Sequence, residues 1–219
     1  MSPEKGPVLL INPNGSTATT RAMARIARQA CPSLRLKAVS TPGGPDVITT
    51  PDLLDAASRA VAGCNVPHAT AGVIVAAFGD PGRKRLAERL DCPVLGIAEA
   101  GIAEAARGGR AFSIATTTPD LIERIREAAH AYGHGDQLIS VQVTKGPPLA
   151  VMSNPDRLQR EMRVAIKACA EDGAEAVVIG GGPLATVARQ LSPESPLPLI
   201  EPVPEAARRM ALMLQGAKV

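Results

Sequence analysis

Two stretches decide the fold: VIVAAFGDPG at residues 73–82 and AVVIGGGPL at residues 176–184. Each is an apolar, β-branched run that breaks into glycines, which is the pattern of a buried strand ending in a loop that lets backbone approach a ligand closely. Residue 77 in the first stretch and residue 181 in the second lie 104 positions apart. We therefore expect two equivalent strand ends in one chain.

The same spacing recurs elsewhere. VLLI at 8–11 precedes NPNGS at 12–16, and FSIA at 112–115 precedes TTTP at 116–119, again 104 positions later. Self-similarity at a fixed offset is the signature of a duplicated unit. The sequence therefore predicts two similar halves with one site between them.

Short apolar runs of strand length alternate with helical segments along the whole chain. Such alternation is typical of parallel sheets covered by helices on both faces. We therefore predict an α/β fold of two pseudo-symmetric lobes, each a parallel sheet flanked by helices, with the site in the cleft between them. The N-terminal lobe is predicted to span residues 1–97 and the C-terminal lobe residues 98–219, with the last helix able to pack back on the first lobe. The predicted strands are 8–11, 34–39, 72–77, 93–97, 111–115, 138–143, 175–180 and 197–200, and the predicted helices are 17–30, 51–63, 82–90, 99–107, 119–132, 155–171, 184–190 and 203–215.

Composition narrows the classes of function. The chain has 219 residues, 45% of them hydrophobic, and a net charge of +3, which fits a protein that buries a sizeable core. Its apolar runs fall well short of the ~20 residues of a membrane helix, and its first seven residues lack the pattern of a secretory signal, so we expect a cytoplasmic protein with no membrane partner. Basic residues are spread along the chain, and two Phe, one Tyr and no Trp give no aromatic platform for nucleic acid. The expected partner is a small-molecule substrate or ligand.

Neither the cysteines nor the glycine-rich motifs indicate a cofactor. No C-x-x-C spacing occurs, so the four cysteines are interpreted as separate thiols, and no cluster of His, Cys and carboxylate residues has the spacing of metal ligands. The glycines at 180–182 lack the G-x-G-x-x-G spacing of a dinucleotide site, and no Gly-Lys-Ser/Thr of a phosphate loop is present. We predict no metal and no cofactor. The glycine run is interpreted as a backbone cradle for an anion or oxyanion, with a simple tight turn as the alternative.

Polar loops follow the predicted strands. In open parallel sheets, ligands bind at the carboxyl ends of the strands. Asn12, Asn14 and Ser16 follow the first strand, and Thr116 and Thr117 stand in the matching place of the second half. These amides and hydroxyls can hold a carboxylate, amide or ureido group, although such residues also cap helices. Their duplication at strand ends favours binding.

The chain resembles the aspartate/glutamate/hydantoin racemase superfamily, and within it most closely the hydantoin and allantoin racemase branch. The segments that carry the resemblance are INPN at 11–14, FGDPG at 78–82, GIAEA at 96–100, FSIATT at 112–117 and EDGAEA at 171–176. The resemblance covers nearly the whole chain in the family's order. It implies a cofactor-independent isomerase fold and a homo-oligomer.

In that family, two cysteines at equivalent strand ends flank the substrate's stereocentre, one removing the α-proton and the other returning a proton to the opposite face. The resemblance places these positions at Ala77 and Gly181, and neither is a cysteine. A methyl group and a hydrogen cannot carry protons. We therefore do not expect racemisation by the two-thiol route. The related decarboxylase and cis-trans isomerase chemistries, which use one or both cysteines, are in doubt for the same reason.

From these observations we predict a diverged enzyme of the superfamily that acts on a small carboxylate, amide or cyclic ureide by cysteine-independent chemistry. One alternative is a non-catalytic small-molecule-binding protein or inactive homologue, and another is a hydantoin- or allantoin-type racemase with non-cysteine bases. Deliberate replacement of both cysteines is a weaker explanation, because the whole 180–183 stretch departs from the family's pattern. The predicted substrate-binding residues are Asn12, Asn14, Ser16, Ala77, Phe78, Gly79, Thr116, Thr117, Gly181, Gly182 and Pro183.

Three acidic residues lie near predicted strand ends. Glu99 and Glu201 are the candidate catalytic groups, although a carboxylate at Glu99 can equally serve its helix dipole. Asp80, within Gly-Asp-Pro-Gly, is interpreted as a turn residue. Acidic groups in the cleft would favour the enzyme, whereas a cleft with only neutral hydrogen-bonding groups would favour the binding protein.

Overall fold

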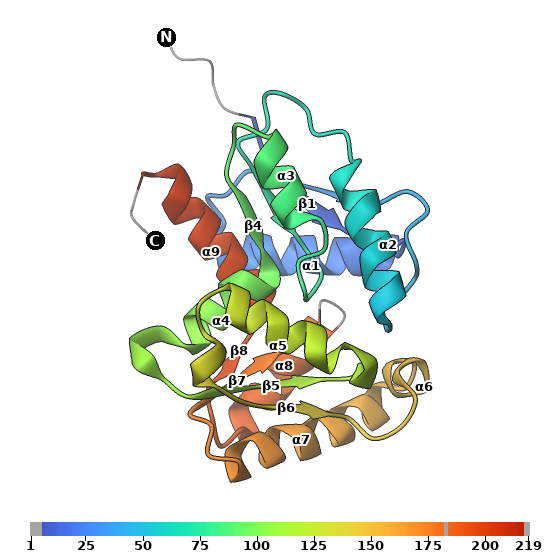
Figure 1. Ribbon diagram of the computed structural model, residues 1–219, viewed down its shortest axis with the longest axis vertical. Coiled ribbons are helices and arrows are strands. Elements are labelled where there is room, and N and C mark those ends of the chain that lie inside the picture. The colour runs from blue at the N-terminus through green and yellow to red at the C-terminus, as the bar shows by residue number, and fades with distance from the viewer. Residues whose placement is uncertain (1–5, 182–183, 217–219) are drawn as a thin grey trace.

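The protein is described by a computed structural model covering residues 6–181 and 184–216. Two four-stranded parallel sheets share the same strand order, β2-β1-β3-β4 in one lobe and β6-β5-β7-β8 in the other, and helices flank both (Figure 1). The prediction of an α/β fold of two pseudo-symmetric lobes is confirmed. The strands are β1 (Val8–Asn12), β2 (Leu36–Ser40), β3 (Gly72–Val75), β4 (Val94–Gly96), β5 (Phe112–Thr116), β6 (Leu138–Val143), β7 (Ala176–Ile179) and β8 (Leu199–Ile200).

All eight predicted helices are present, within a few residues of their expected ends, and three of them begin at a capping side chain. The side chains of Ser16, Thr50 and Asn154 each accept a hydrogen bond from a backbone N–H in the first turn, which satisfies donors that a helix start leaves free. None of the helices in the described ranges combines the length and hydrophobicity needed to span a membrane. The helices are α1 (Thr17–Ala30), α2 (Pro51–Ala62), α3 (Arg83–Arg89), α4 (Ile97–Ala105), α5 (Ile122–Ala131), α6 (Pro148–Met152), α7 (Pro155–Glu171), α8 (Ala185–Leu191) and α9 (Pro202–Leu214).

Strand register brings the site loops to one level. In the first sheet Ile11 pairs with both Val39 and Val75, and in the second sheet Ala115 pairs with Gln142 and Ile179. Because the strands are parallel, their carboxyl ends meet at the same edge of each sheet. The loops that follow β1, β3, β5 and β7 meet between the lobes, where residues from all four line one cavity.

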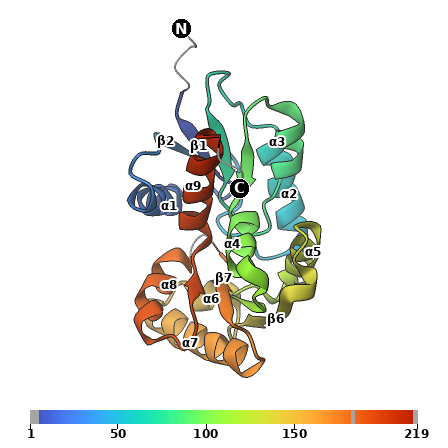
Figure 2. The ribbon, with the colours of Figure 1, turned by 90° about the vertical axis from the view of Figure 1, so that its left-hand side faces the viewer.

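Helices α4 and α9 connect the lobes. Helix α9 follows β8 of the second sheet, yet its residues Val203 and Met210 pack in one core with Leu10 and Met23 of the first lobe. Helix α4 follows β4 of the first sheet and contributes to both cores, since one of its faces packs with the second sheet. Figures 1 and 2 both show α9 lying beside α1 and away from the second sheet. The predicted lobe limits of 1–97 and 98–219 stay a prediction, because these helices belong to more than one layer of packing.

Candidate small-molecule site

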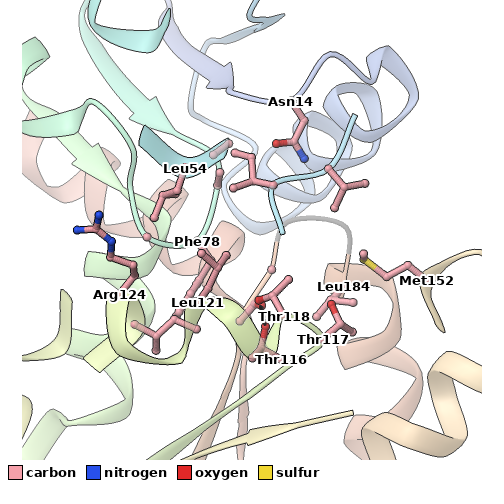
Figure 3. Close-up of a pocket in the computed structure, with 18 residues that line it drawn as sticks. Asn14, Leu54, Phe78, Thr116, Thr117, Thr118, Leu121, Arg124, Met152 and Leu184 are labelled. Atoms are coloured by element: carbon pink, nitrogen blue, oxygen red, sulfur yellow. Dashed lines mark hydrogen bonds between the residues drawn. The ribbon is translucent and has the colours of Figure 1, made fainter. Parts of the chain in front are cut away.

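A cavity of about 50 Å³ lies between the lobes, at the carboxyl ends of both sheets (Figure 3). The first lobe supplies the loops after β1 and β3 together with part of α2. The second lobe supplies the loops after β5 and β7, the start of α5 and the end of α6. The lining residues are Asn14, Val47, Ile48, Leu54, Ala76, Ala77, Phe78, Gly79, Thr116, Thr117, Thr118, Leu121, Arg124, Ile125, Met152, Gly180, Gly181 and Leu184.

Seven of the predicted binding residues line this cavity, and they come from all four converging loops. Two others, Asn12 and Ser16, do not line it. Gly182 and Pro183 lie outside the described residues. The seven are Asn14, Ala77, Phe78, Gly79, Thr116, Thr117 and Gly181.

Asn12 and Ser16 shape the loop after β1. Asn12 is fully buried; its Nδ2 donates to Thr20 Oγ1 at 2.9 Å and its Oδ1 accepts from the backbone N–H of Asn14 at 3.0 Å. The hydroxyl of Ser16 accepts from the backbone N–H of Thr19 at 3.2 Å as the cap of α1. Both side chains are thus occupied in holding Asn14 and the helix start in place.

Asn14 is the polar residue that the first lobe presents to the cavity. Its side chain reaches from the loop toward the threonines of the second lobe in Figure 3. Only 5% of the residue is exposed, and its Oδ1 accepts no hydrogen bond within the described residues. An unmet buried acceptor costs free energy, so a ligand N–H at this position would gain a partner that is already oriented.

The threonines after β5 form the opposite wall. Thr116 Oγ1 donates to the carbonyl oxygen of Gly180 at 2.8 Å and lies 3.2 Å from Thr118 Oγ1, so Thr116 connects two of the site loops. Thr117 is 2% exposed and lines the cavity, and its hydroxyl makes no hydrogen bond among the residues described. Thr117 is therefore the hydroxyl most available to a ligand.

Asp80 does more than form a turn. It is a buried residue with a left-handed backbone, φ 48°, and its carboxylate accepts from the backbone N–H groups of Ala98 and Glu99 at 2.9 and 2.8 Å and from the Tyr132 hydroxyl at 2.8 Å. Burial raises the pKa of Asp80 to about 6 in spite of these three donors. Asp80 thus joins the loop that carries Ala77 and Phe78 to the start of α4 and the end of α5.

The two candidate catalytic acids do not line the cavity. Glu99 lies 3.3 Å from the guanidinium of Arg83, and its Oε2 accepts from the backbone N–H of Gly96 at the start of its own helix. Glu201 lies 2.9 Å from Nε of Arg189. Each acid is paired with an arginine and neither is among the lining residues, so the structure does not bring them to the binding residues.

Several lining residues had no signal in the sequence. Leu121 and Ile125 look like ordinary core positions of a helix, and Met152 belongs to α6, a short helix between the predicted strand 138–143 and the predicted helix 155–171. Arg124 lies between these positions with nothing in its local pattern to mark it. For Leu121, Arg124 and Ile125, the one available signal is that they directly follow the Thr116–Thr118 loop.

No group suited to proton transfer lines the cavity within the described residues. Its one charged side chain there is Arg124, whose guanidinium carries hydrogen-bond donors and no acceptor. The cysteines lie elsewhere: three are half-buried, and Cys169 on α7 is buried in a cluster with Met162 and Val177 of the second lobe. No group of three or more potential metal ligands occurs in the part of the chain that is described. What the arrangement offers a ligand is hydrogen bonds and one positive charge.

The fold and its central cavity define a two-lobed α/β protein with a candidate small-molecule site between two parallel sheets of equivalent strand order. Residues 8–210 match the family described as Asp/Glu/Hydantoin racemase, and the chain belongs to that family. A hydantoin racemase from Paenarthrobacter aurescens is 35% identical, with 93% of this chain and 89% of that protein covered. An allantoin racemase structure from Klebsiella pneumoniae matches with a TM-score of 0.84 and 31% identity, covering 97% of this chain and 89% of the other. The allantoin racemase structure from Pseudomonas fluorescens has a TM-score of 0.85 and 25% identity, with 97% and 92% covered.

Proposed function

We propose that this protein binds a small carboxylate, amide or cyclic ureide in the cavity between its lobes and does not exchange a proton at the ligand's stereocentre. The observation that carries the proposal is the cavity lining, which within the described residues holds amide and hydroxyl groups and one arginine but no thiol, imidazole or carboxylate. A general acid or base must lie within hydrogen-bonding reach of the proton that it moves.

The ligand class follows from the groups present. Asn14 offers an unmet carbonyl acceptor, and Thr117 offers a hydroxyl that can donate or accept. Amides and ureides carry matching N–H and C=O groups. The printed names of the relatives, hydantoin racemase and allantoin racemase, support the same class.

The missing thiols support binding without turnover. The resemblance places the family's two cysteines at Ala77 and Gly181, and both residues line the cavity. Cysteine-independent catalysis would need Glu99 or Glu201 to leave its arginine partner and enter the cavity. The geometry therefore favours the binding protein over the diverged enzyme.

Titration calorimetry tests the proposal with hydantoin, 5-substituted hydantoins, allantoin and small diacids. We expect saturable binding of at least one ureide. The affinity should be at least tenfold lower in Ala77→Leu, because the larger side chain would occupy the cavity. Ala69→Leu is the matched control, since Ala69 is exposed and lies before the other end of β3. Thermal melting of both variants would show that each is folded.

Two results would contradict the proposal. Equal ligand affinity in Ala77→Leu and the wild type would show that the ligand binds outside the cavity. Inversion of a single enantiomer of a bound ureide, faster than in buffer, would establish a racemase with non-cysteine bases instead. The homo-oligomer implied by the resemblance stays a prediction, which light scattering of the purified protein would check.

A further inference from the structure

Arg124 lies at the boundary between the cavity and the surface. It lines the cavity and also an outer groove of about 620 Å³, which is formed by α2, α3 and α5. In Figure 3 its guanidinium turns outward, away from Thr116 and Thr117, while its stem lies beside Leu121. The charged end of this side chain is therefore at the mouth of the site.

The present partners of Arg124 hold it weakly. Its guanidinium lies 3.3 Å from Asp55 Oδ2, on α2 of the other lobe, and 3.4 Å from Glu127 Oε2, on its own helix. Charge-assisted hydrogen bonds of good geometry are about 2.7–2.9 Å long, and exposed ion pairs contribute little. The side chains of Arg124, Asp55 and Glu127 are 41%, 51% and 65% exposed. A ligand anion with better geometry could replace these carboxylates.

Ligand entry would itself disturb the contact between Arg124 and Asp55. The cavity, at about 50 Å³, has room for only a few water molecules, so a ring with substituents requires its walls to separate. The pair between Arg124 and Asp55 joins walls from different lobes. Separation of α2 from α5 would break this pair and leave the guanidinium free to face inward.

The two ends of the cavity differ in what they can recognise. Asn14 presents an unmet acceptor at one end, and Arg124 provides the only charge among the described lining residues at the other. A ligand that satisfies both would carry an N–H donor at one end and an anionic group at the other.

We propose that Arg124 is the specificity-determining residue for ligands with an anionic group, and that Asp55 competes with the ligand for its guanidinium in the empty protein. This inference rests on the proposed function, and it narrows the ligand class to a ureide or amide that also bears a carboxylate. Asp55 then acts as a charge-balancing partner that is displaced when the ligand binds.

The test compares two probes of nearly the same shape, hydantoin-5-acetic acid and its neutral carboxamide, which differ at a single group. Calorimetry on the wild-type protein should give at least tenfold tighter binding of the carboxylate. Arg124→Gln should remove most of that preference, whereas Asp55→Asn should raise carboxylate affinity several-fold. Arg126→Gln is the matched control, because Arg126 lies on the same helix, pairs with Glu123 and does not line the cavity.

Each outcome has a distinct meaning. Equal binding of the two probes, with no change of preference in Arg124→Gln, would overturn the inference and leave the proposed function intact. Failure of both probes and of the neutral ureides to bind would overturn the proposed function itself. Arg126→Gln could also reduce the preference for the carboxylate as much as Arg124→Gln does. That result would show that general surface charge sets the preference, and it would overturn the inference.

Discussion

At the scale of single residues, a substitution at Thr117 should change ligand affinity with little effect on the stability of the fold. Its hydroxyl faces the cavity without a hydrogen bond in the described structure, so Thr117→Val should leave the free energy of unfolding nearly unchanged. Ligand affinity should fall roughly three- to tenfold, which corresponds to the loss of one hydrogen bond. Calorimetry and thermal melting measure the two quantities.

Thr70→Val provides the control for Thr117→Val. Thr70 lies before β3, at the edge of the sheet opposite the cavity, so its substitution should change neither affinity nor specificity. Equal losses of affinity in the two variants would show that Thr117 does not contact the ligand.

The double variant Ala77→Cys, Gly181→Cys tests whether the cavity retains the geometry for two-sided proton transfer. A thiolate and a thiol with tuned pKa values can exchange a proton at a stereocentre. Gly181 does not have a positive φ, and a Cβ there would lie 3.1 Å from the Leu184 side chain, which must move by a few tenths of an ångström. We expect hydantoin racemisation above the wild-type level. Its absence in a folded, ligand-binding double variant would show that the two positions no longer face one stereocentre.

At the scale of secondary-structure elements, Asp80 links the β3 loop to two helices. It acts as a cap for α4, and the Tyr132 hydroxyl ties it to α5 of the other lobe. Gly96 is required beside it, because a Cβ at that position would overlap the Asp80 carboxylate. The wall of the cavity at Phe78 is therefore set by contacts on both lobes.

The buried carboxyl of Asp80 predicts a pH dependence with a definite sign. Its pKa is raised to about 6 in the folded protein from about 3.9 in an unfolded chain, so the native state keeps its proton over a range where the unfolded state has lost it. The stability that Asp80 contributes therefore falls as pH rises from about 4 to about 6 and is constant above that range.

Asp80→Asn removes this titration. The free energy of unfolding of the wild type relative to Asp80→Asn should decrease by about 2–3 kcal/mol between pH 4 and pH 7, measured by urea unfolding at each pH. Glu99, Arg83 and Tyr132 are the neighbouring ionisable groups, and they are unchanged in the variant. A difference that stays flat or increases with pH would contradict the burial of Asp80.

The elements themselves could largely be predicted from sequence, because strand length, β-branched runs and cap residues are local signals. The errors have local causes as well. Helix α5 begins at Ile122 instead of residue 119, since Thr118 does not cap it and a 3₁₀ turn, Pro119–Leu121, comes first. Helix α6 has no counterpart among the predicted helices, because the five residues after Pro147 are too few to show a helical period.

The candidate site could be predicted only in part, because its remaining walls depend on tertiary packing. Asn14 and Thr117 follow strands and were found by the rule for parallel sheets. Arg124, Leu54 and Met152 reach the cavity only because α2, α5 and α6 from different lobes meet there. The partners of Glu99 and Glu201 are also contacts that sequence spacing does not reveal.

At the scale of the whole molecule, the sharing of α4 and α9 between the lobes predicts joint unfolding. Met210 on α9 is fully buried in the core of the first lobe, although α9 follows a strand of the second. Met210→Ala should cost about 2–5 kcal/mol, and both lobes should lose hydrogen-exchange protection together. Selective loss of protection in the first lobe alone would show that the lobes fold independently.

The most direct test of the central claim is proton NMR of the wild-type protein in deuterium oxide with one enantiomer of a 5-substituted hydantoin. We expect broadened ligand signals, which report binding, and a C5 proton that disappears no faster than in buffer. The double cysteine variant serves as the comparison for exchange. Faster loss of the C5 proton with the wild-type protein would show that it moves protons at the stereocentre without thiols, and would contradict binding without turnover.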